Sequence, residues 1–306
     1  MVTKVAELSV PANAAQAQRW NGASGQYWIA HRERHLAEHQ NLTPHLFRAA
    51  GISPGERVLD VGCGCGGTTI AAARAARAAR GEAEDGPAGR SPGSGQFGMT
   101  GRAVGLDLSG LMLQVARQLA VRAHAANAAF VRSDAQACPL RRNSFDVMIS
   151  NFGVMFFDNP GMAFASIAST VRPHGRLAFL CWQDDTHNEV FAIPLRAFGA
   201  HMPLPPPASG DLFVDPRKIT SLLSSTGWAD VQIASVTEPA WIGSDVDDVM
   251  SYIRGMPTTR NLAASLADEP LTEQILAAIA EQYAARQRPD GVWVRAAAWL
   301  VTALRA

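Results

Sequence analysis

The sequence is poor in cysteine, has no excess of either charge and contains no long apolar run. Its four cysteines, Cys63, Cys65, Cys138 and Cys181, are too few and too scattered for a disulfide scaffold. Two of them form the segment Cys63-Gly64-Cys65, which would suggest a metal site. No second Cys or His pair follows at zinc-like spacing, so we expect no metal.

Lys and Arg together number 27, and so do Asp and Glu, so no overall charge attracts nucleic acid or an anionic membrane. No apolar stretch is long enough to cross a bilayer. Residues 1–18 lack the apolar core and cleavage site of a secretory signal. These features predict a soluble, cytoplasmic protein with neither nucleic acid nor membrane as partner; a homo-oligomer remains compatible with them.

A glycine-dense turn is the most informative feature that is present. Residues 57–69 read RVLDVGCGCGGTT, a short apolar strand that ends in an acid, then a turn, then the start of a helix. Glycine lacks a Cβ and lets a ligand approach the backbone closely. The free N–H groups at a helix start favour an anion. The segment predicts a nucleotide-type cofactor site.

Short apolar segments alternate with helical segments over the first 180 residues. The predicted strands cover residues 57–61, 102–106, 129–132, 145–150 and 176–182. This alternation is typical of an α/β, doubly wound, Rossmann-like parallel sheet with right-handed crossovers. Residues 81–95 have a low-complexity composition that cannot bury a core, so we interpret them as a mobile insert.

The remaining segments suggest additions to this core. We expect a helical cap segment at residues 1–50, a core at residues 51–243, a helical lid at residues 244–290 and a final strand of the core at residues 291–306. The lid would lie over the open end of the sheet, where ligands bind in such folds.

The glycine pattern alone does not decide which cofactor binds. Gly62, Gly64 and Gly67 satisfy the dinucleotide fingerprint, so an NAD(P)-dependent oxidoreductase is one alternative. Asp60 argues against it, because a carboxylate before the first glycine would repel a pyrophosphate but would suit an ammonium group. Asp107 ends the second strand and could accept both ribose hydroxyls, which fits either cofactor. The third strand ends near Asp134, which could accept from an adenine amine or cap a turn.

Several motifs together carry a family resemblance. The segments 58–66 (VLDVGCGCG), 105–109 (GLDLS), 134–136 (DAQ) and 145–157 are similar to those of class I S-adenosylmethionine-dependent methyltransferases. The ubiquinone/menaquinone-biosynthesis type and its small-molecule relatives are the most similar branch. Residues 172–177 resemble the family's Pro-Gly-Gly turn, with His174 in place of a glycine. The similarity extends over residues 15–183.

The resemblance implies a fold and a cofactor. The sheet would have seven strands, mostly parallel, with an antiparallel last strand at residues 292–304. The cofactor would be S-adenosyl-L-methionine, with S-adenosyl-L-homocysteine as product. Trp20 and Tyr27, from the N-terminal segment, would close over it. The other cofactor-binding residues implied are Asp60, Gly62, Cys63, Gly64, Gly66, Asp107, Leu108, Met112, Asp134, Ala135, Asn151 and Phe152.

In-line methyl transfer mainly requires alignment of the reacting atoms and exclusion of water. A base is needed only if the nucleophile must lose a proton. His31 and His187 are the catalytic candidates, with His35 and His201 as further histidines near the expected cleft, although a histidine in such a position is more often a surface or packing residue. A cyclase that keeps the bound sulfonium only as a fixed cation is a further alternative.

Aromatic and apolar side chains predict the character of the acceptor. They would line an apolar chamber beneath the lid, which favours a small aromatic, polyketide or terpenoid acceptor, typical of secondary metabolism, over a macromolecule. Methylation could occur on O, N or C. The predicted substrate-lining residues are Trp28, Phe156, Trp182, Trp241 and Met256.

Overall fold

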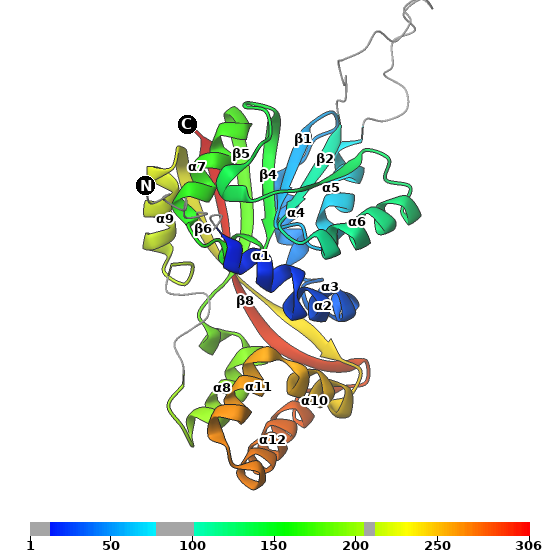
Figure 1. The fold of residues 1–306 in the computed structure, drawn as a ribbon, viewed down its shortest axis with the longest axis vertical. Helices are drawn as coiled ribbons and strands as arrows, with labels where there is room; N and C mark the ends of the chain where they lie inside the picture. The colour runs from blue at the N-terminus through cyan, green and yellow to red at the C-terminus, as the bar shows by residue number, and fades with distance from the viewer. Residues whose placement is uncertain (1–12, 78–100, 205–211) are drawn as a thin grey trace, which may run out of the picture.

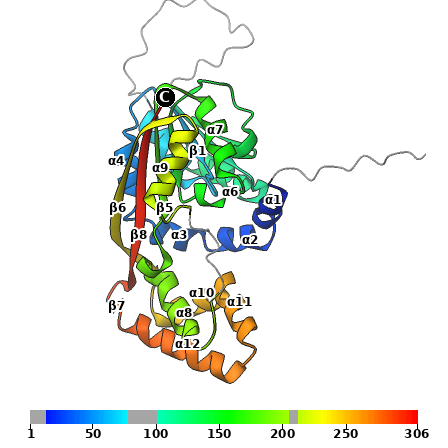
Figure 2. The ribbon, with the colours of Figure 1, turned by 90° about the vertical axis from the view of Figure 1, so that its left-hand side faces the viewer.

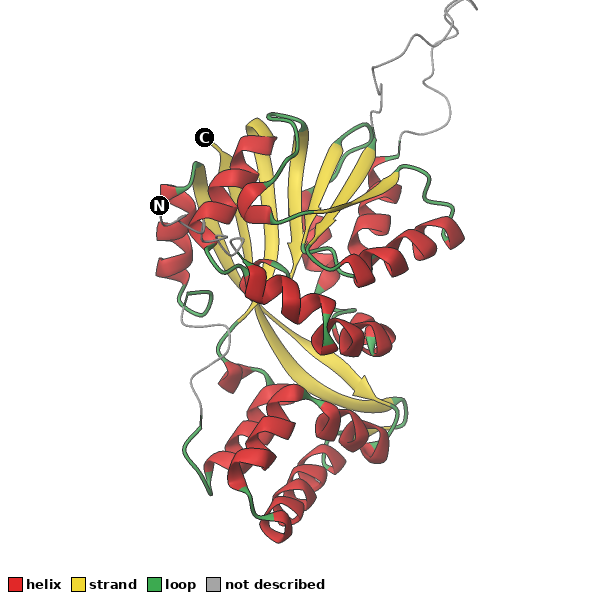
Figure 3. Cartoon of the chain, in the orientation of Figure 1, coloured by secondary structure: helices red, strands yellow, loops and turns green. Residues whose placement is uncertain are grey.

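The computed structural model describes residues 13–77, 101–204 and 212–306. The insert expected at residues 81–95 lies outside the described residues. The described chain is a mixed α/β fold with one large sheet, flanking helices and a second group of helices at one end (Figures 1 and 3).

The sheet has the strand order β3-β2-β1-β4-β5-β8-β6. Strands β1 to β5 pair in parallel, whereas β8 runs antiparallel to both β5 and β6. The predicted doubly wound sheet with an antiparallel last strand is therefore confirmed. An eighth, two-residue strand, β7 (Gln287–Arg288), pairs with β8 and was not expected. The other bounds are β1 Arg57–Val61, β2 Arg102–Asp107, β3 Ala128–Arg132, β4 Phe145–Asn151, β5 Val171–Trp182, β6 Trp228–Gly243 and β8 Gly291–Arg305.

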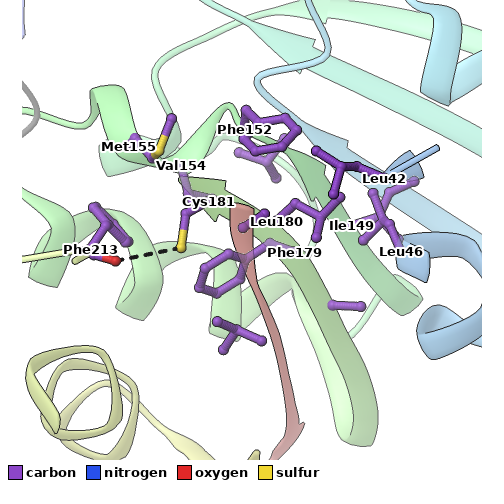
Figure 4. Packing of buried hydrophobic residues seen from close by; sticks show 14 of the residues in the cluster. Leu42, Leu46, Ile149, Phe152, Val154, Met155, Phe179, Leu180, Cys181 and Phe213 are labelled. Atoms are coloured by element: carbon purple, nitrogen blue, oxygen red, sulfur yellow. Dashed lines mark hydrogen bonds between the residues drawn. The ribbon is translucent and has the colours of Figure 1, made fainter. Parts of the chain in front are cut away.

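Helices cover both faces of this sheet, as parallel strands require. Figure 2 shows α4 and α7 on opposite sides of it. Figure 4 shows the apolar packing between the layers, where the Cys181 thiol donates to the carbonyl oxygen of Phe213 over 3.8 Å. Leu59, Met148 and Phe179 are fully buried in this core. The helices are α4 Thr43–Ala50, α5 Gly67–Ala76, α6 Gly110–Arg122, α7 Pro160–Thr170 and α9 Pro216–Ser225.

The N-terminal segment is a series of short helices rather than one long one. Helices α1 (Ala14–Asn21), α2 (Ala23–Ala30) and α3 (Arg32–Glu38) cross the carboxyl ends of the parallel strands. They lie between the sheet and the second helical group (Figures 1 and 2). The structure thus places these three helices, not the predicted lid, directly against the open end of the sheet.

The second helical group is larger than the predicted lid. It contains α10 (Val246–Gly255), α11 (Pro257–Leu266) and α12 (Glu269–Ala284), and also α8 (Glu189–Gly199), which the sequence analysis did not predict. Strands β6 and β8 continue as a two-stranded pair beyond the ends of the parallel strands, and this pair connects the sheet to the second helical group (Figure 1).

Two further observations concern what the described residues lack. No helix in residues 13–77, 101–204 or 212–306 is both long and apolar enough to cross a membrane. Within the same ranges, no cluster of three His, Cys, Asp or Glu side chains could hold a metal ion. All four cysteines are free thiols.

Candidate active site

A cavity of about 450 Å³ lies at the carboxyl ends of β1, β2, β4 and β5, closed by residues of α1–α3. This volume is within the range of small-molecule sites. Most of the predicted site residues line it. These are Trp20, Trp28, Gly62, Cys63, Gly64, Asp107, Leu108, Met112, Asp134, Ala135, Asn151, Phe152, Phe156 and Trp182.

The other predicted residues do not line the cavity, for different reasons. Asp60 and Gly66 lie in the strand end and turn that form its floor. The ring of Tyr27 faces away, toward His31 and Tyr252. The remaining ones are His31, His187, Trp241 and Met256.

Two residues predicted to line the acceptor chamber, Trp241 and Met256, lie away from this cavity. The Trp241 indole N–H donates to the carbonyl oxygen of Asp290 over 3.1 Å, at the far end of the extended β6. Met256 follows the last residue of α10, in the second helical group. Because β6 continues well past the ends of the parallel strands, both side chains lie away from the cavity.

The two candidate bases are also displaced from it. His187 is exposed in the short 3-10 turn Asp185–His187. The ring of His31 packs 4.3 Å from that of Tyr27 and 5.4 Å from that of Tyr252. Burial lowers the pKa of His31, and the charges of His35 and Arg34 lower it further.

The glycine turn after β1 is required by the protein's own packing. Gly62 has φ +68°, and a Cβ there would lie 2.8 Å from the Cα of Gly153. The turns after β1 and β4 therefore touch backbone to backbone. A Cβ at Gly66, which has φ +82°, would lie 2.7 Å from the ring of Phe130. Both conformations favour glycine.

Asp60 is a fully buried carboxylate beneath this turn. Its Oδ2 accepts hydrogen bonds from the hydroxyls of Thr68 and Thr69, each over 2.6 Å. Its Oδ1 is buried without a partner. Burial raises the pKa of Asp60 to about 6 against the effect of the two threonine hydrogen bonds, and the charge of Asp107 raises it further. The free acceptor beside Gly62 suits a cationic donor.

Asp107 links the end of β2 to the glycine turn. Its Oδ2 accepts from the main-chain N–H of Gly64 over 2.8 Å, and its Oδ1 accepts from that of Ser109 over the same distance. Burial raises the pKa of Asp107, and these backbone donors oppose the rise. Ser109 also caps α6 by accepting from the N–H of Met112, which fixes the Met112 side chain in the cavity wall.

Asp134 has two internal partners, which gives it the turn-capping role. Its Oδ1 accepts from the main-chain N–H of Gln136 and from the Asn13 side-chain amide, and its Oδ2 accepts from the Gln136 amide. Asn13 lines the cavity as well, and its own Oδ1 is buried without a partner. The sequence analysis missed Asn13, because nothing in its local pattern connects it with the third strand.

An aromatic wall forms the opposite end of the cavity. The rings of Phe152 and Trp182 stack 4.0 Å apart at 25°, and His39 lies 4.5 Å from Phe152. Trp20 packs edge-to-face on Phe156 at 4.9 Å. Phe152 has φ +63°, an uncommon value for a residue with a Cβ. The buried Oδ1 of Asn151 has no partner beside this wall.

Helix α3 contributes a set of wall residues that the sequence analysis did not assign. His35 appeared there only among several possible histidines. The set follows the i, i+3, i+4, i+7 spacing of one helix face, which is the signal that could have revealed it. Its members are Arg32, His35, Leu36 and His39.

Residues 52–193 match a family model described as a methyltransferase domain. An uncharacterised protein of Mycobacterium tuberculosis is 30% identical over 142 residues, which cover 46% of this chain and 42% of that protein. The ubiquinone/menaquinone biosynthesis C-methyltransferase UbiE of Teredinibacter turnerae is 30% identical over 132 residues, 43% of this chain and 45% of the enzyme. The chain thus spans less than half the length of these relatives.

A solved structure shows the same fold. The YcgJ protein of Bacillus subtilis matches with a TM-score of 0.52 at 16% identity, over 87% of this chain and 98% of that one. At this identity the match concerns the arrangement of helices and strands.

Proposed function

We propose that this chain, whose residues 52–193 match a family model of a methyltransferase domain, is a class I S-adenosylmethionine-dependent enzyme that transfers the methyl group to a small, largely apolar molecule. One observation carries the proposal. Three buried acceptor oxygens without partners, the Oδ1 atoms of Asn13, Asp60 and Asn151, belong to residues in or beside one cavity. Buried acceptors of this kind require donors.

The cofactor fits this set because its polar ends are donors. The Oδ1 of Asp60 would take the methionine ammonium, and Asp107 the ribose hydroxyls. The free oxygen of Asn13, held beside Asp134, would take the adenine amine, with Leu108 and Met112 against the ring. A dinucleotide would instead bring a pyrophosphate next to the buried carboxylate of Asp60, which is unfavourable.

When bound, the cofactor supplies an electrophilic methyl group on a positively charged sulfur. The residues of this chain would hold the acceptor in line with that group and keep water away. Helices α1–α3 close the cavity, and Trp20 packs across Phe156 at its edge.

The acceptor would be small and largely apolar. The wall formed by Trp28, Phe152, Phe156 and Trp182 offers rings to pack against, with few charges. The name of the UbiE relative, a C-methyltransferase of quinone biosynthesis, supports an apolar ring compound. We propose a metabolite of secondary metabolism, methylated on O, N or C.

The location and partners follow from composition. Four free thiols are typical of a reducing compartment, so we propose that the protein acts in the cytoplasm. Balanced charge supports a metabolite rather than nucleic acid as the partner.

Calorimetry with S-adenosylhomocysteine tests the proposal most directly. We expect saturable binding to one site, and no binding would contradict the proposal. A parallel fluorescence titration with NADH and NADPH should show no tight site. A candidate acceptor incubated with methyl-labelled S-adenosylmethionine should gain the label with equimolar release of S-adenosylhomocysteine. Conversion of the acceptor without that release would instead identify a cyclase.

A further inference from the structure

A buried polar cluster lies at the C-terminal end of α3, beside the cavity. It consists of His35, Glu38 and His39, of which 7%, 4% and 8% respectively is exposed. Glu38 lies 3.4 Å from His35, measured from Oε2 to Nδ1. A buried carboxylate is costly unless it is paired, and His35 is the side chain that pairs with Glu38.

Glu38 is held in its charged form. Burial alone would raise the pKa of Glu38, but the hydrogen bond from His35, supported by the charge of Arg34, opposes burial, and the pKa is lowered. The Arg34 guanidinium is itself fixed in place, because it donates to the carboxylate of Asp248 and to the carbonyl oxygen of Ile242.

His35 presents its other nitrogen without a partner. Its ring stacks on Trp28, with centroids 3.7 Å apart and planes at 23°, and both residues line the cavity. With Nδ1 directed at Glu38, the neutral imidazole carries its proton on Nδ1 and a free lone pair on Nε2. The Nε2 atom is buried and has no hydrogen-bond partner. His35 therefore brings an unpartnered imidazole nitrogen to the wall of the cavity.

The other histidines of this region do not share this arrangement. His39 also lines the cavity, but burial lowers its pKa to about 4 in spite of the nearby Glu38 charge, and its ring packs against those of Phe152 and Trp182. His31 does not line the cavity.

Among the other titratable groups near His35 are two tyrosines, and neither is ionised at neutral pH. The ring of Tyr252, from α10, lies 6.0 Å from that of His35, and burial raises its pKa well above the ordinary value, so it stays neutral. Burial likewise raises the pKa of Tyr27, from α2, to about 12. Both phenols therefore keep their protons through the neutral range.

We propose that His35 accepts the proton of an acidic hydroxyl, phenolic or enolic, on the methyl acceptor, and that Glu38 positions its ring and balances the resulting charge. The inference rests on the proposed function and narrows its substrate class. It makes His35 a catalytic residue and Glu38 a positioning residue.

The proposed step is balanced in atoms and electrons. The hydroxyl O–H bond breaks and its proton forms a new bond to Nε2 of His35. An electron pair of the oxygen forms the bond to the methyl carbon. The pair of the carbon–sulfur bond remains on sulfur, which leaves as a neutral thioether. The product is an ether, and His35 is left as an imidazolium beside the Glu38 carboxylate.

The test uses 4-nitrophenol as a phenolic probe on the full chain loaded with S-adenosylhomocysteine. The neutral and ionised forms of this phenol absorb at different visible wavelengths, so the spectrum reports where its proton is. We expect the bound probe to ionise at a pH roughly one unit or more below that of the free probe, because the proton moves to a charge-balanced imidazole. A bound probe that titrates as it does in solution would overturn the proposal, and this measurement needs no variant.

Three variants locate the effect. His35→Gln should bind S-adenosylhomocysteine as the wild type does and lose the shift, and Glu38→Gln should lose most of it. His31→Gln, one turn earlier and outside the cavity, should retain it. A shift that survives in folded His35→Gln would contradict the role of His35. If S-adenosylhomocysteine binds but the phenol does not, the acceptor class is wrong while the methyltransferase proposal stands; if neither binds, the methyltransferase proposal fails.

Discussion

The main-chain N–H of Gly64 donates to Oδ2 of Asp107 over 2.8 Å, so the turn after β1 and the end of β2 hold each other in position. The other oxygen of Asp107 accepts from Ser109, the residue that caps α6. A single carboxylate thus joins the glycine turn, a strand end and a helix start around the cavity.

Asp107→Ala should weaken S-adenosylhomocysteine binding by roughly 2–3 kcal/mol, about 30- to 150-fold. The change removes the acceptor for the ribose hydroxyls and leaves the N–H groups of Gly64 and Ser109 without their partner. Calorimetry measures the effect. Asp247→Ala, at an exposed acid of α10, is the control and should bind normally. An unchanged dissociation constant in Asp107→Ala would refute the ribose contact.

Gly62→Ala should destabilise the fold more than Gly51→Ala does. Both glycines have positive φ, but a Cβ at Gly51 meets nothing within 4 Å, whereas at Gly62 it would lie 2.8 Å from the Cα of Gly153. The strain at φ costs roughly 1 kcal/mol at each site, and the steric clash should add about 1–3 kcal/mol at Gly62. Urea unfolding compares the two. Equal losses would show that the turns after β1 and β4 separate freely.

Cofactor affinity should fall as the pH is lowered through about 6. The pKa of Asp60 is raised to about 6, so below that pH its carboxyl is increasingly protonated and no longer attracts an ammonium group. Between pH 7 and 5 we expect roughly a tenfold weakening of S-adenosylhomocysteine binding. Asp60→Asn should bind weakly at every pH and show a smaller dependence on pH. An identical slope in wild type and variant would exclude Asp60 as the source.

The same carboxyl should affect the stability of the ligand-free protein in the opposite sense to a salt bridge. Its folded-state pKa lies above the ordinary 3.8, so the folded state binds the proton more tightly than the unfolded state. Its contribution to stability therefore increases as the pH falls from about 6 to 3.8. The wild type minus Asp60→Asn difference in unfolding free energy, measured across this range, should change accordingly.

Asp146 should stabilise the fold at neutral pH and lose that effect in acid. Its two oxygens accept from Arg57 and Arg172. Burial alone would raise the pKa of Asp146, but these hydrogen bonds and the Arg57 charge lower it to about 2. The unfolded value of 3.8 is higher, so the stabilisation is complete above pH 4 and is lost as the pH falls toward 2. Asp146→Asn should cost roughly 2 kcal/mol at pH 7.

Denaturant unfolding at pH 7 and at pH 2.5 checks this, with Asp247→Asn as the control. The difference between wild type and Asp146→Asn should shrink markedly at the lower pH. If the difference in unfolding free energy were the same at both pH values, the loss of stability in Asp146→Asn would come from packing and not from the ionisation of Asp146.

The sequence predicted the strands of the parallel sheet from their short, mostly apolar segments between turn residues. Strands β1, β2 and β4 and residues 176–182 of β5 are mostly buried, because both faces of a parallel sheet are covered. Helix α8 was missed because Pro194 lies inside it, and proline is normally unfavourable in a helix interior.

In the candidate site, too, residues that carry a local sequence pattern could be predicted, whereas residues brought in by long-range contacts could not. The glycine turn and the acids at the strand ends carry a local pattern, and the cavity contains or adjoins them. Asn13, His35 and His39 reach the cavity only because α1–α3 dock across the strand ends, a long-range contact that no local pattern encodes. Trp241 and Met256 lie away from the cavity for the converse reason, since local composition does not tell how far β6 continues beyond the parallel strands.

The position of β8 has a consequence for how the chain is made. This strand follows all the others in the sequence, yet it lies inside the sheet between β5 and β6. During synthesis, therefore, β5 and β6 have no neighbour on that side until residues 291–305 have left the ribosome. Exposed strand edges readily pair with other chains. A nascent chain stalled just short of this strand should depend on chaperones and should be prone to aggregate.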